Sequence, residues 1–150
     1  KNLIAIIGDG SFMMSLQELA TLMHHKIKIK LILINNEGYS MIKQTQEQWL
    51  NSNYVASSFK GGLSFPKYKK IAESFKLDYF ELDNNEEKIL YDFLENKKAS
   101  FLNVKISPNA RVTPQVKFGR PNEDMEPLLS REDFIKNMII NPLPISYEDF

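Results

Sequence analysis

The sequence predicts an α/β fold, an open and mostly parallel sheet with helices on both faces. Two apolar runs rich in Ile and Leu, residues 3–7 and 29–34, are typical of strands buried on both faces, as in a parallel sheet. A helical pattern separates these runs, and a second alternation of helix and strand follows them. A strand–helix–strand unit of this spacing is expected to have a right-handed crossover.

The first helix is expected to open at Ser15, because residues 15–18 read Ser-Leu-Gln-Glu, which has the form of a capping box. The apolar residues that follow recur at helical spacing and predict one buried stripe: Leu16, Leu19, Ala20 and Met23.

Further elements follow up to residue 106. Pro66 suits the first turn of a helix whose apolar side carries Ile71, Ala72 and Phe75. Residues 78–82 and 101–106 are expected to be strands, with a turn at Asn84-Asn85. Between them, residues 86–95 predict a helix with four inward side chains: Ile89, Leu90, Phe93 and Leu94.

The composition changes after residue 106, which predicts two regions. Residues 1–106 form the α/β domain, and residues 107–150 form a proline-rich extended arm with a short helix. Six of the seven prolines lie between Pro108 and Pro144, and residues 130–133 are suited to cap a helix through residue 139. Because the chain opens directly on a strand, without methionine, we expect it to be a piece of a longer protein.

Composition and charge exclude several classes of protein. Nineteen Lys and Arg balance nineteen Asp and Glu, so the chain lacks the basic character of a nucleic-acid binder. With no cysteine and two histidines, it has neither a thiolate nor a multi-histidine metal site. No apolar run approaches the roughly 20 residues that cross a bilayer, and the apolar run at residues 3–7 is too short for a signal peptide, so we expect a cytoplasmic protein with no membrane partner.

Two polar turns carry the functional signal. Gly8-Asp9-Gly10-Ser11 follows the first predicted strand, and Asn35-Asn36 follows the next one. Both therefore reach the carboxyl edge of the sheet, where open α/β folds bind ligands. A carboxylate and an amide oxygen suit Mg²⁺, and Gly10 and Ser11 suit a phosphate group, so the pattern predicts a magnesium-bridged diphosphate. Taken separately, each turn also has a purely structural interpretation.

The run at residues 8–21, Gly-Asp-Gly-Ser-Phe-Met-Met-Ser-Leu-Gln-Glu-Leu-Ala-Thr, together with Asn35-Asn36, resembles the thiamine-diphosphate-dependent enzymes, and most closely their acetolactate synthase branch. The resemblance covers most of residues 1–106 and implies thiamine diphosphate and Mg²⁺ as cofactors. It implies three metal ligands: Asp9, the side chain of Asn36 and the carbonyl of Gly38. It further places around the cofactor the following residues: Gly8, Gly10, Ser11, Tyr39, Ser40 and Met41.

The resemblance implies decarboxylation of a 2-oxo acid such as pyruvate and carboligation to a second carbonyl. In this family the activating glutamate lies in the pyrimidine-binding domain of a neighbouring subunit. The resemblance therefore assigns no catalytic residue to this chain and implies that this piece alone is inactive. It also implies a homodimer or tetramer. Thr45 replaces the usual tryptophan and Ser15 the usual asparagine. The runs Asn-Asn-Glu-Gly-Tyr at residues 35–39 and Lys-Gln-Thr-Gln at residues 43–46 resemble homologues from bacterial surface-sugar pathways. Two alternatives remain: two-carbon transfer to a keto-sugar nucleotide, and a non-catalytic phosphate- or nucleotide-binding module.

Aromatic residues beyond the second turn have two interpretations. Trp49, Tyr54 and Phe59 follow the cofactor turn, so they either line a substrate entrance or cover the end of the sheet. Tyr79, by contrast, is interpreted as a core residue.

Overall fold

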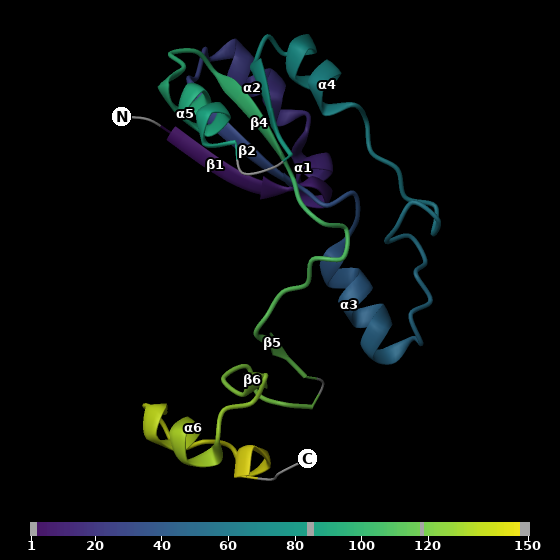
Figure 1. The fold of residues 1–150 in the computed structure, drawn as a ribbon, viewed down its shortest axis with the longest axis vertical. Helices are drawn as coiled ribbons and strands as arrows, with labels where there is room; N and C mark the ends of the chain where they lie inside the picture. The colour runs from purple at the N-terminus through teal and green to yellow at the C-terminus, as the bar shows by residue number, and fades with distance from the viewer. Residues whose placement is uncertain (1–2, 84–85, 118, 148–150) are drawn as a thin grey trace. The chain divides into compact units, whose positions relative to one another are not determined.

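The computed structural model describes residues 3–83, 86–117 and 119–147. They form two compact units, residues 1–110 and 111–150. The first unit contains a four-stranded parallel sheet in the order β1-β2-β4-β3, shown in Figure 1. Its strands are β1 (Leu3–Gly8), β2 (Ile29–Asn35), β3 (Asp78–Leu82) and β4 (Ser100–Lys105). The predicted open, parallel α/β sheet is confirmed.

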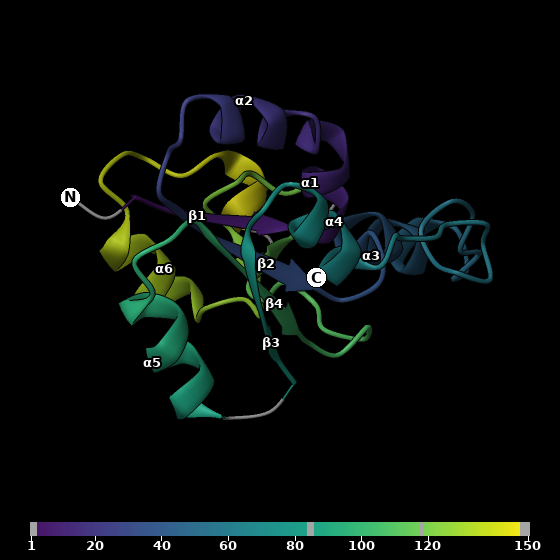
Figure 2. The ribbon, with the colours of Figure 1, turned by 90° about the horizontal axis from the view of Figure 1, so that it is seen from above.

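Helices cover both faces of the sheet (Figure 2). Moving from β1 to β2 and from β3 to β4 crosses the sheet in opposite directions, so two crossovers of the same hand must lie on opposite faces. Accordingly, α1 (Asp9–Ser15), α2 (Glu18–His24) and α4 (Tyr68–Ser74) pack on one face, and α5 (Glu87–Glu95) packs on the other.

The main core lies under the first group of helices. Its buried members come from both helices and strands: Phe12, Leu19, Leu31, Leu33, Tyr68, Ala72, Leu77 and Phe101. On the opposite face Phe93 of α5 is fully buried and meets the Phe80 ring edge-on at 5.7 Å. The remaining helix of this unit, α3 (Ser40–Trp49), follows the turn after β2. No helix of the described residues is long and apolar enough to cross a membrane.

The first helix begins six residues earlier than the capping box predicts. It opens at Asp9, directly after β1, and Ser15 is its last residue rather than its cap. The Ser15 hydroxyl donates to the carbonyl of Ser11, four residues earlier, at 3.3 Å, which is the back-bond that serine makes to its own helix. Of the expected buried stripe, Leu19 is buried and Leu16 is half-buried, whereas Ala20 and Met23 are exposed. Phe12, which was not in the stripe, is buried as well.

The expectation that both first strands are buried on both faces holds for β2 and is wrong for β1. β2 lies between β1 and β4, whereas β1 is an edge strand. Ile4 and Ile6, on the face opposite α1 and α2, are 48% and 69% exposed, because α5 is packed at the other end of the sheet, on β3.

The later elements lie within one or two residues of their predicted bounds. α5 begins at Glu87, and β4 runs from Ser100 to Lys105. Of the four side chains expected to face inward from α5, Phe93 is buried, while Leu90 and Leu94 are 38% and 39% exposed. The turn expected at residues 84–85 lies outside the described residues.

The second unit, residues 111–150, contains more structure than an extended arm with one helix. β5 (Gln115–Val116) pairs antiparallel with β6 (Met125–Glu126), α6 spans Arg131–Asn137, and a 3₁₀ helix spans Pro144–Tyr147. Ser130 caps α6, as predicted, by accepting a hydrogen bond from the amide of Asp133 at 3.1 Å. The helix ends at Asn137, two residues earlier than expected.

Candidate functional site

The turns after β1 and β2 lie side by side because the two strands are in register. Gly8, the last residue of β1, pairs with Ile34 near the end of β2. A pocket of about 450 Å³ lies between the turns. All nine residues expected at the cofactor line it: Gly8, Asp9, Gly10, Ser11, Asn36, Gly38, Tyr39, Ser40 and Met41. Three apolar residues complete the lining: Met14, Ile34 and Ile42.

Asp9 joins the two turns through its carboxylate. One oxygen, Oδ2, accepts hydrogen bonds from the amides of Asn36 and Gly38, both at 3.2 Å, and Oδ1 accepts one from the amide of Gly10 at 2.7 Å. The residue is 3% exposed. Its burial raises the pKa of the carboxyl above its usual 3.8, and the amide hydrogen bonds act in the opposite direction. Because burial disfavours the charged form of Asp9, a cation bound beside it would stabilise the carboxylate.

Asn36 presents an acceptor that has no partner. Its amide nitrogen donates to the hydroxyl of Ser40 at 2.6 Å, and that hydroxyl in turn donates to the carbonyl of Ala110 at 3.0 Å. Because these bonds fix the orientation of the amide, the oxygen Oδ1 is left as a free acceptor. It is buried and has no hydrogen-bond partner within the described residues. Such atoms are rare in folded proteins, since leaving one unpaired costs on the order of 1–3 kcal/mol.

Two of the three glycines in the turns, Gly10 and Gly38, are required by close packing, whereas a Cβ atom at Gly8 would have no neighbour within 4 Å. A Cβ atom at Gly10 would lie 2.5 Å from the Cε1 atom of Tyr39. A Cβ atom at Gly38 would lie 2.6 Å from the ammonium of Lys43 and 2.9 Å from the carbonyl oxygen of Ser57. Any larger residue would therefore displace the tyrosine ring or the turn itself, so these positions are confined to glycine.

The donor set fits a hard divalent cation. The described residues hold no cluster of three or more His, Asp or Glu side chains that suits a metal ion. One carboxylate, at Asp9, stands with the unpaired amide oxygen of Asn36 beside the same pocket. Mg²⁺ is commonly held by one or two carboxylates, with phosphate and water oxygens completing its shell. The residues present therefore fit a magnesium ion that is carried in with a phosphate ligand.

The rim of the pocket is apolar and open. Met14 and Met41 are 77% and 60% exposed, and Ile42 is 47% exposed. Polar groups in the turns and apolar groups at the rim suit a ligand with a charged end and an organic ring. Trp49, Tyr54 and Phe59, which were expected either at a substrate entrance or over the end of the sheet, are absent from the lining of this pocket.

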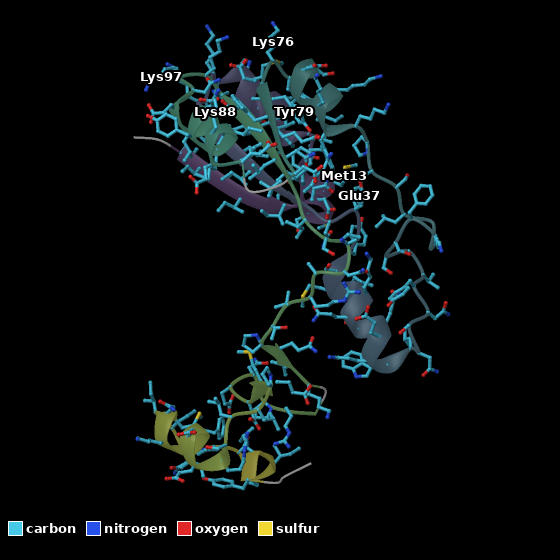
Figure 3. All side chains as sticks on the ribbon, in the orientation of Figure 1. Met13, Glu37, Lys76, Tyr79, Lys88 and Lys97 are labelled. Carbon is cyan, nitrogen blue, oxygen red and sulfur yellow. The ribbon has the colours of Figure 1, made fainter. Side chains whose placement is uncertain are left out.

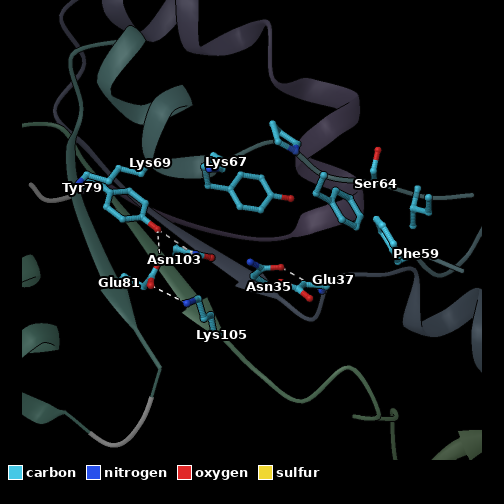
Figure 4. A pocket seen from close by; sticks show the side chains of 14 residues that line it. Asn35, Glu37, Phe59, Ser64, Lys67, Lys69, Tyr79, Glu81, Asn103 and Lys105 are labelled. Atoms are coloured by element: carbon cyan, nitrogen blue, oxygen red, sulfur yellow. Dashed lines mark hydrogen bonds and ion pairs between the residues drawn. The ribbon is translucent and has the colours of Figure 1, made fainter.

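A second pocket, which the sequence patterns above do not predict, lies at the same edge of the sheet. It lies on the α4 face and is lined by side chains of β3 and β4 together with Glu37 (Figure 4). Figure 3 also shows Glu37 at this end of the sheet, away from Lys76 and Lys97 at the amino ends of the strands. Tyr79, interpreted as core, lines this pocket. The signal that would have found it is the alternation of polar residues at the ends of two predicted strands, Glu81 in one and Asn103 and Lys105 in the other.

Comparison with known proteins identifies the family. The profile of the family described as "Thiamine pyrophosphate enzyme, C-terminal TPP binding domain" matches residues 1–104. The chain is 32% identical over 124 residues to the acetolactate synthase large subunit of Porphyra purpurea, with 81% of this chain and 21% of that protein covered. It is 34% identical over 128 residues to that of Lactococcus lactis, with 83% and 21% covered.

The acetolactate synthase isozyme 1 large subunit of Escherichia coli is 28% identical over 127 residues, with 83% of this chain and 22% of that protein covered. The chain thus spans about a fifth of the length of these relatives. Because the family profile covers more than half of the chain, the family is established by sequence and agrees with the parallel α/β sheet. The chain belongs to the thiamine-diphosphate-dependent enzymes, and residues 1–104 are their C-terminal, cofactor-binding domain.

Proposed function

We propose that this chain is the cofactor-binding part of a magnesium-dependent, acetolactate synthase-like enzyme. That enzyme removes CO₂ from a 2-oxo acid such as pyruvate and joins the remaining fragment to a second carbonyl. The observation that carries the magnesium assignment is the unpaired, buried Oδ1 atom of Asn36 beside the buried carboxylate of Asp9. The names of the relatives support the reaction class.

Three groups of this chain would hold the metal: the carboxylate of Asp9, the side-chain oxygen of Asn36 and the carbonyl of Gly38. Gly8, Gly10, Ser11, Tyr39 and Ser40 would surround the diphosphate, and Met41 the organic part of the cofactor. When bound, thiamine diphosphate supplies the electron sink of the reaction, and the protein supplies position and electrostatics. The role of this domain is to anchor the charged end of the cofactor.

The remaining chemistry is assigned to a second domain. Among the residues that the structure describes, no acidic side chain other than Asp9 lines the pocket, so we assign no proton-transferring group here. In the proposal, the pyrimidine-binding domain of a neighbouring subunit closes over the exposed apolar rim formed by Met14, Met41 and Ile42. The active enzyme is then a homodimer or tetramer.

The acceptor is the second carbonyl substrate. The alternative acceptor, a keto-sugar nucleotide in place of a second pyruvate, is motivated by Thr45. Thr45 turns its hydroxyl back onto the carbonyl of Met41 at 3.1 Å. A threonine in this place occupies much less volume beside Met41 than the tryptophan of the acetolactate synthase pattern. Product analysis with pyruvate as the only substrate distinguishes the two: abundant acetolactate supports the synthase, and its absence supports the sugar acceptor.

Calorimetric titration of thiamine diphosphate into the intact protein, with and without Mg²⁺, tests the cofactor site. The variant Asp9→Asn keeps the shape of the side chain and removes its charge, and it should abolish magnesium-dependent binding. Glu37→Gln is the matched control, because it removes an exposed carboxylate from the same turn outside the pocket. Equal binding with and without Mg²⁺, or unchanged binding by Asp9→Asn, would contradict the proposal.

A further inference from the structure

The second pocket has a volume of about 570 Å³ and shares none of its lining residues with the cofactor pocket. It lies at the ends of β3 and β4, and Asn35 and Glu37 separate it from the cofactor turn (Figure 4). The volume is within the range of pockets that hold organic ligands. Neither the family profile nor the relatives assign a role to it.

One end of the second pocket is a rigid polar network. Lys105 pairs with Glu81, with 2.7 Å between Nζ and Oε1, and the hydroxyl of Tyr79 donates to the Oε2 atom of Glu81 at 2.5 Å. The amide nitrogen of Asn103 donates to the Tyr79 hydroxyl at 3.1 Å and to Glu81 at 3.2 Å. Figure 4 shows these bonds as dashed lines on one side of the cavity.

These hydrogen bonds fix the orientation of the Asn103 amide and leave its oxygen without a hydrogen-bond partner among the described residues. The amide cannot be flipped, because its oxygen would then face the carboxylate of Glu81. The side-chain oxygen Oδ1 is buried without a hydrogen-bond partner in the described part of the chain, and the residue is 3% exposed. The pocket therefore contains a fixed acceptor that needs a donor.

Tyr68 supplies the complementary group. It lines the same pocket, is 5% exposed, and its hydroxyl also has no hydrogen-bond partner among the described residues. Burial raises the pKa of the Tyr68 hydroxyl well above its usual value, so this group keeps its proton and acts as a donor. Ligand hydroxyls suit these two groups, because a hydroxyl can donate to the oxygen of Asn103 and can accept from the hydroxyl of Tyr68.

The other walls favour a ring with an acidic substituent. Phe59 and Phe65 line the pocket together with Tyr68 and Tyr79, and Phe59 is 82% exposed, so its ring is available for contact. Two more lysines, Lys67 and Lys69, belong to the lining and have no carboxylate partner in the described chain, whereas Lys105 is neutralised by Glu81.

We propose that this second pocket binds a polyhydroxylated ring that carries one acidic group, such as a sugar phosphate. Its hydroxyls pair with Asn103 and Tyr68, its ring packs on Phe59 and Phe65, and its acidic group faces Lys67 and Lys69. The site shares no lining residue with the cofactor pocket.

Saturation-transfer NMR on the intact protein with glucose 6-phosphate tests the proposal, with glucose, inorganic phosphate and AMP as comparison probes. Glucose 6-phosphate should bind more tightly than either glucose or phosphate. Tyr68→Phe removes one hydroxyl and keeps the core ring, so the Kd should rise about five- to tenfold, as for one lost hydrogen bond. Tyr91→Phe is the matched control, since Tyr91 is 66% exposed on α5 and outside the pocket.

Asn103→Leu provides a second variant, and it should weaken glucose 6-phosphate binding at least as much. Asp9→Asn should lose thiamine diphosphate and retain the sugar phosphate, so failure of one site is distinguishable from failure of the other. No binding of glucose 6-phosphate, binding that survives both Tyr68→Phe and Asn103→Leu, equal binding of inorganic phosphate, or tighter binding of AMP would each overturn the proposal.

Discussion

Asp124 holds the second unit together, and its removal should unfold that unit alone. The carboxylate is 1% exposed and pairs with two arginines, Arg120 at 2.9 Å and Arg131 at 3.0 Å. The same two guanidinium groups donate to the carbonyls of Ile145 and Ser146 at 3.0 and 2.8 Å. The network therefore ties the loop after β5, the start of α6 and the 3₁₀ helix to one point.

The loss of unfolding free energy expected on removing the Asp124 charge is comparable with the total unfolding free energy of the second unit. Removing one partner of a buried ion pair costs about 3–5 kcal/mol, because the other charge stays buried and unpaired. A unit as short as residues 111–150 has on the order of 2–6 kcal/mol in total, at about 0.05–0.15 kcal/mol per residue. Phe134 is the only fully buried apolar side chain among the described residues of this unit, so little apolar burial offsets the loss.

Hydrogen exchange measured by mass spectrometry on the intact Asp124→Asn protein tests this prediction. Amides of residues 120–147 should lose protection, and those of β2 should keep it. Glu123→Gln is the control, because Glu123 is the exposed neighbour of Asp124. Unchanged protection of residues 120–147 in Asp124→Asn would show that the ion pairs do not hold this unit, and the reasoning would fail.

Three further predictions concern the first unit. Gly10→Ala places a Cβ atom 2.5 Å from the ring of Tyr39, so thiamine diphosphate affinity, measured by calorimetry, should fall at least tenfold with little change in melting temperature. Lys30→Met removes a buried ammonium that donates to the carbonyls of Asn96 and Lys98, and urea unfolding should show a loss of about 2 kcal/mol. Because the pKa of Asp9 is raised above 3.8, its stabilising contribution to the metal-free fold is present below 3.8 and is lost as the pH rises through the raised pKa. Mg²⁺ requires the ionised carboxylate. As the pH is lowered, magnesium affinity should therefore begin to fall at a higher pH than it would with an exposed aspartate, and magnesium titrations at several pH values check this.

The sequence by itself determined the order of strands and helices and the position of both functional turns. Local patterns carry this information: β2 is a continuous apolar run, and Asp9 and Asn36 each follow such a run directly. In a parallel sheet, consecutive strands joined by a short crossover end at the same edge. Spacing alone therefore placed Gly8–Ser11 and Asn36 at one edge of the sheet. The resemblance to thiamine-diphosphate-dependent enzymes added the other residues expected in the pocket, Gly38, Tyr39, Ser40 and Met41.

Only the tertiary structure decided which of the local sequence patterns are reflected in the fold. The capping box at Ser15 is overridden because the end of β1 leads straight into α1, whose first turn carries Asp9 against the amides of the second turn. β1 and β2 have similar sequences, and their burial differs because one is at the edge of the sheet and the other is central. The unpaired groups of Tyr68 and Asn103 meet at one cavity although 35 positions separate them, since pairing of β3 with β4 and packing of α4 bring them together, and such long-range contacts leave no trace in local sequence patterns.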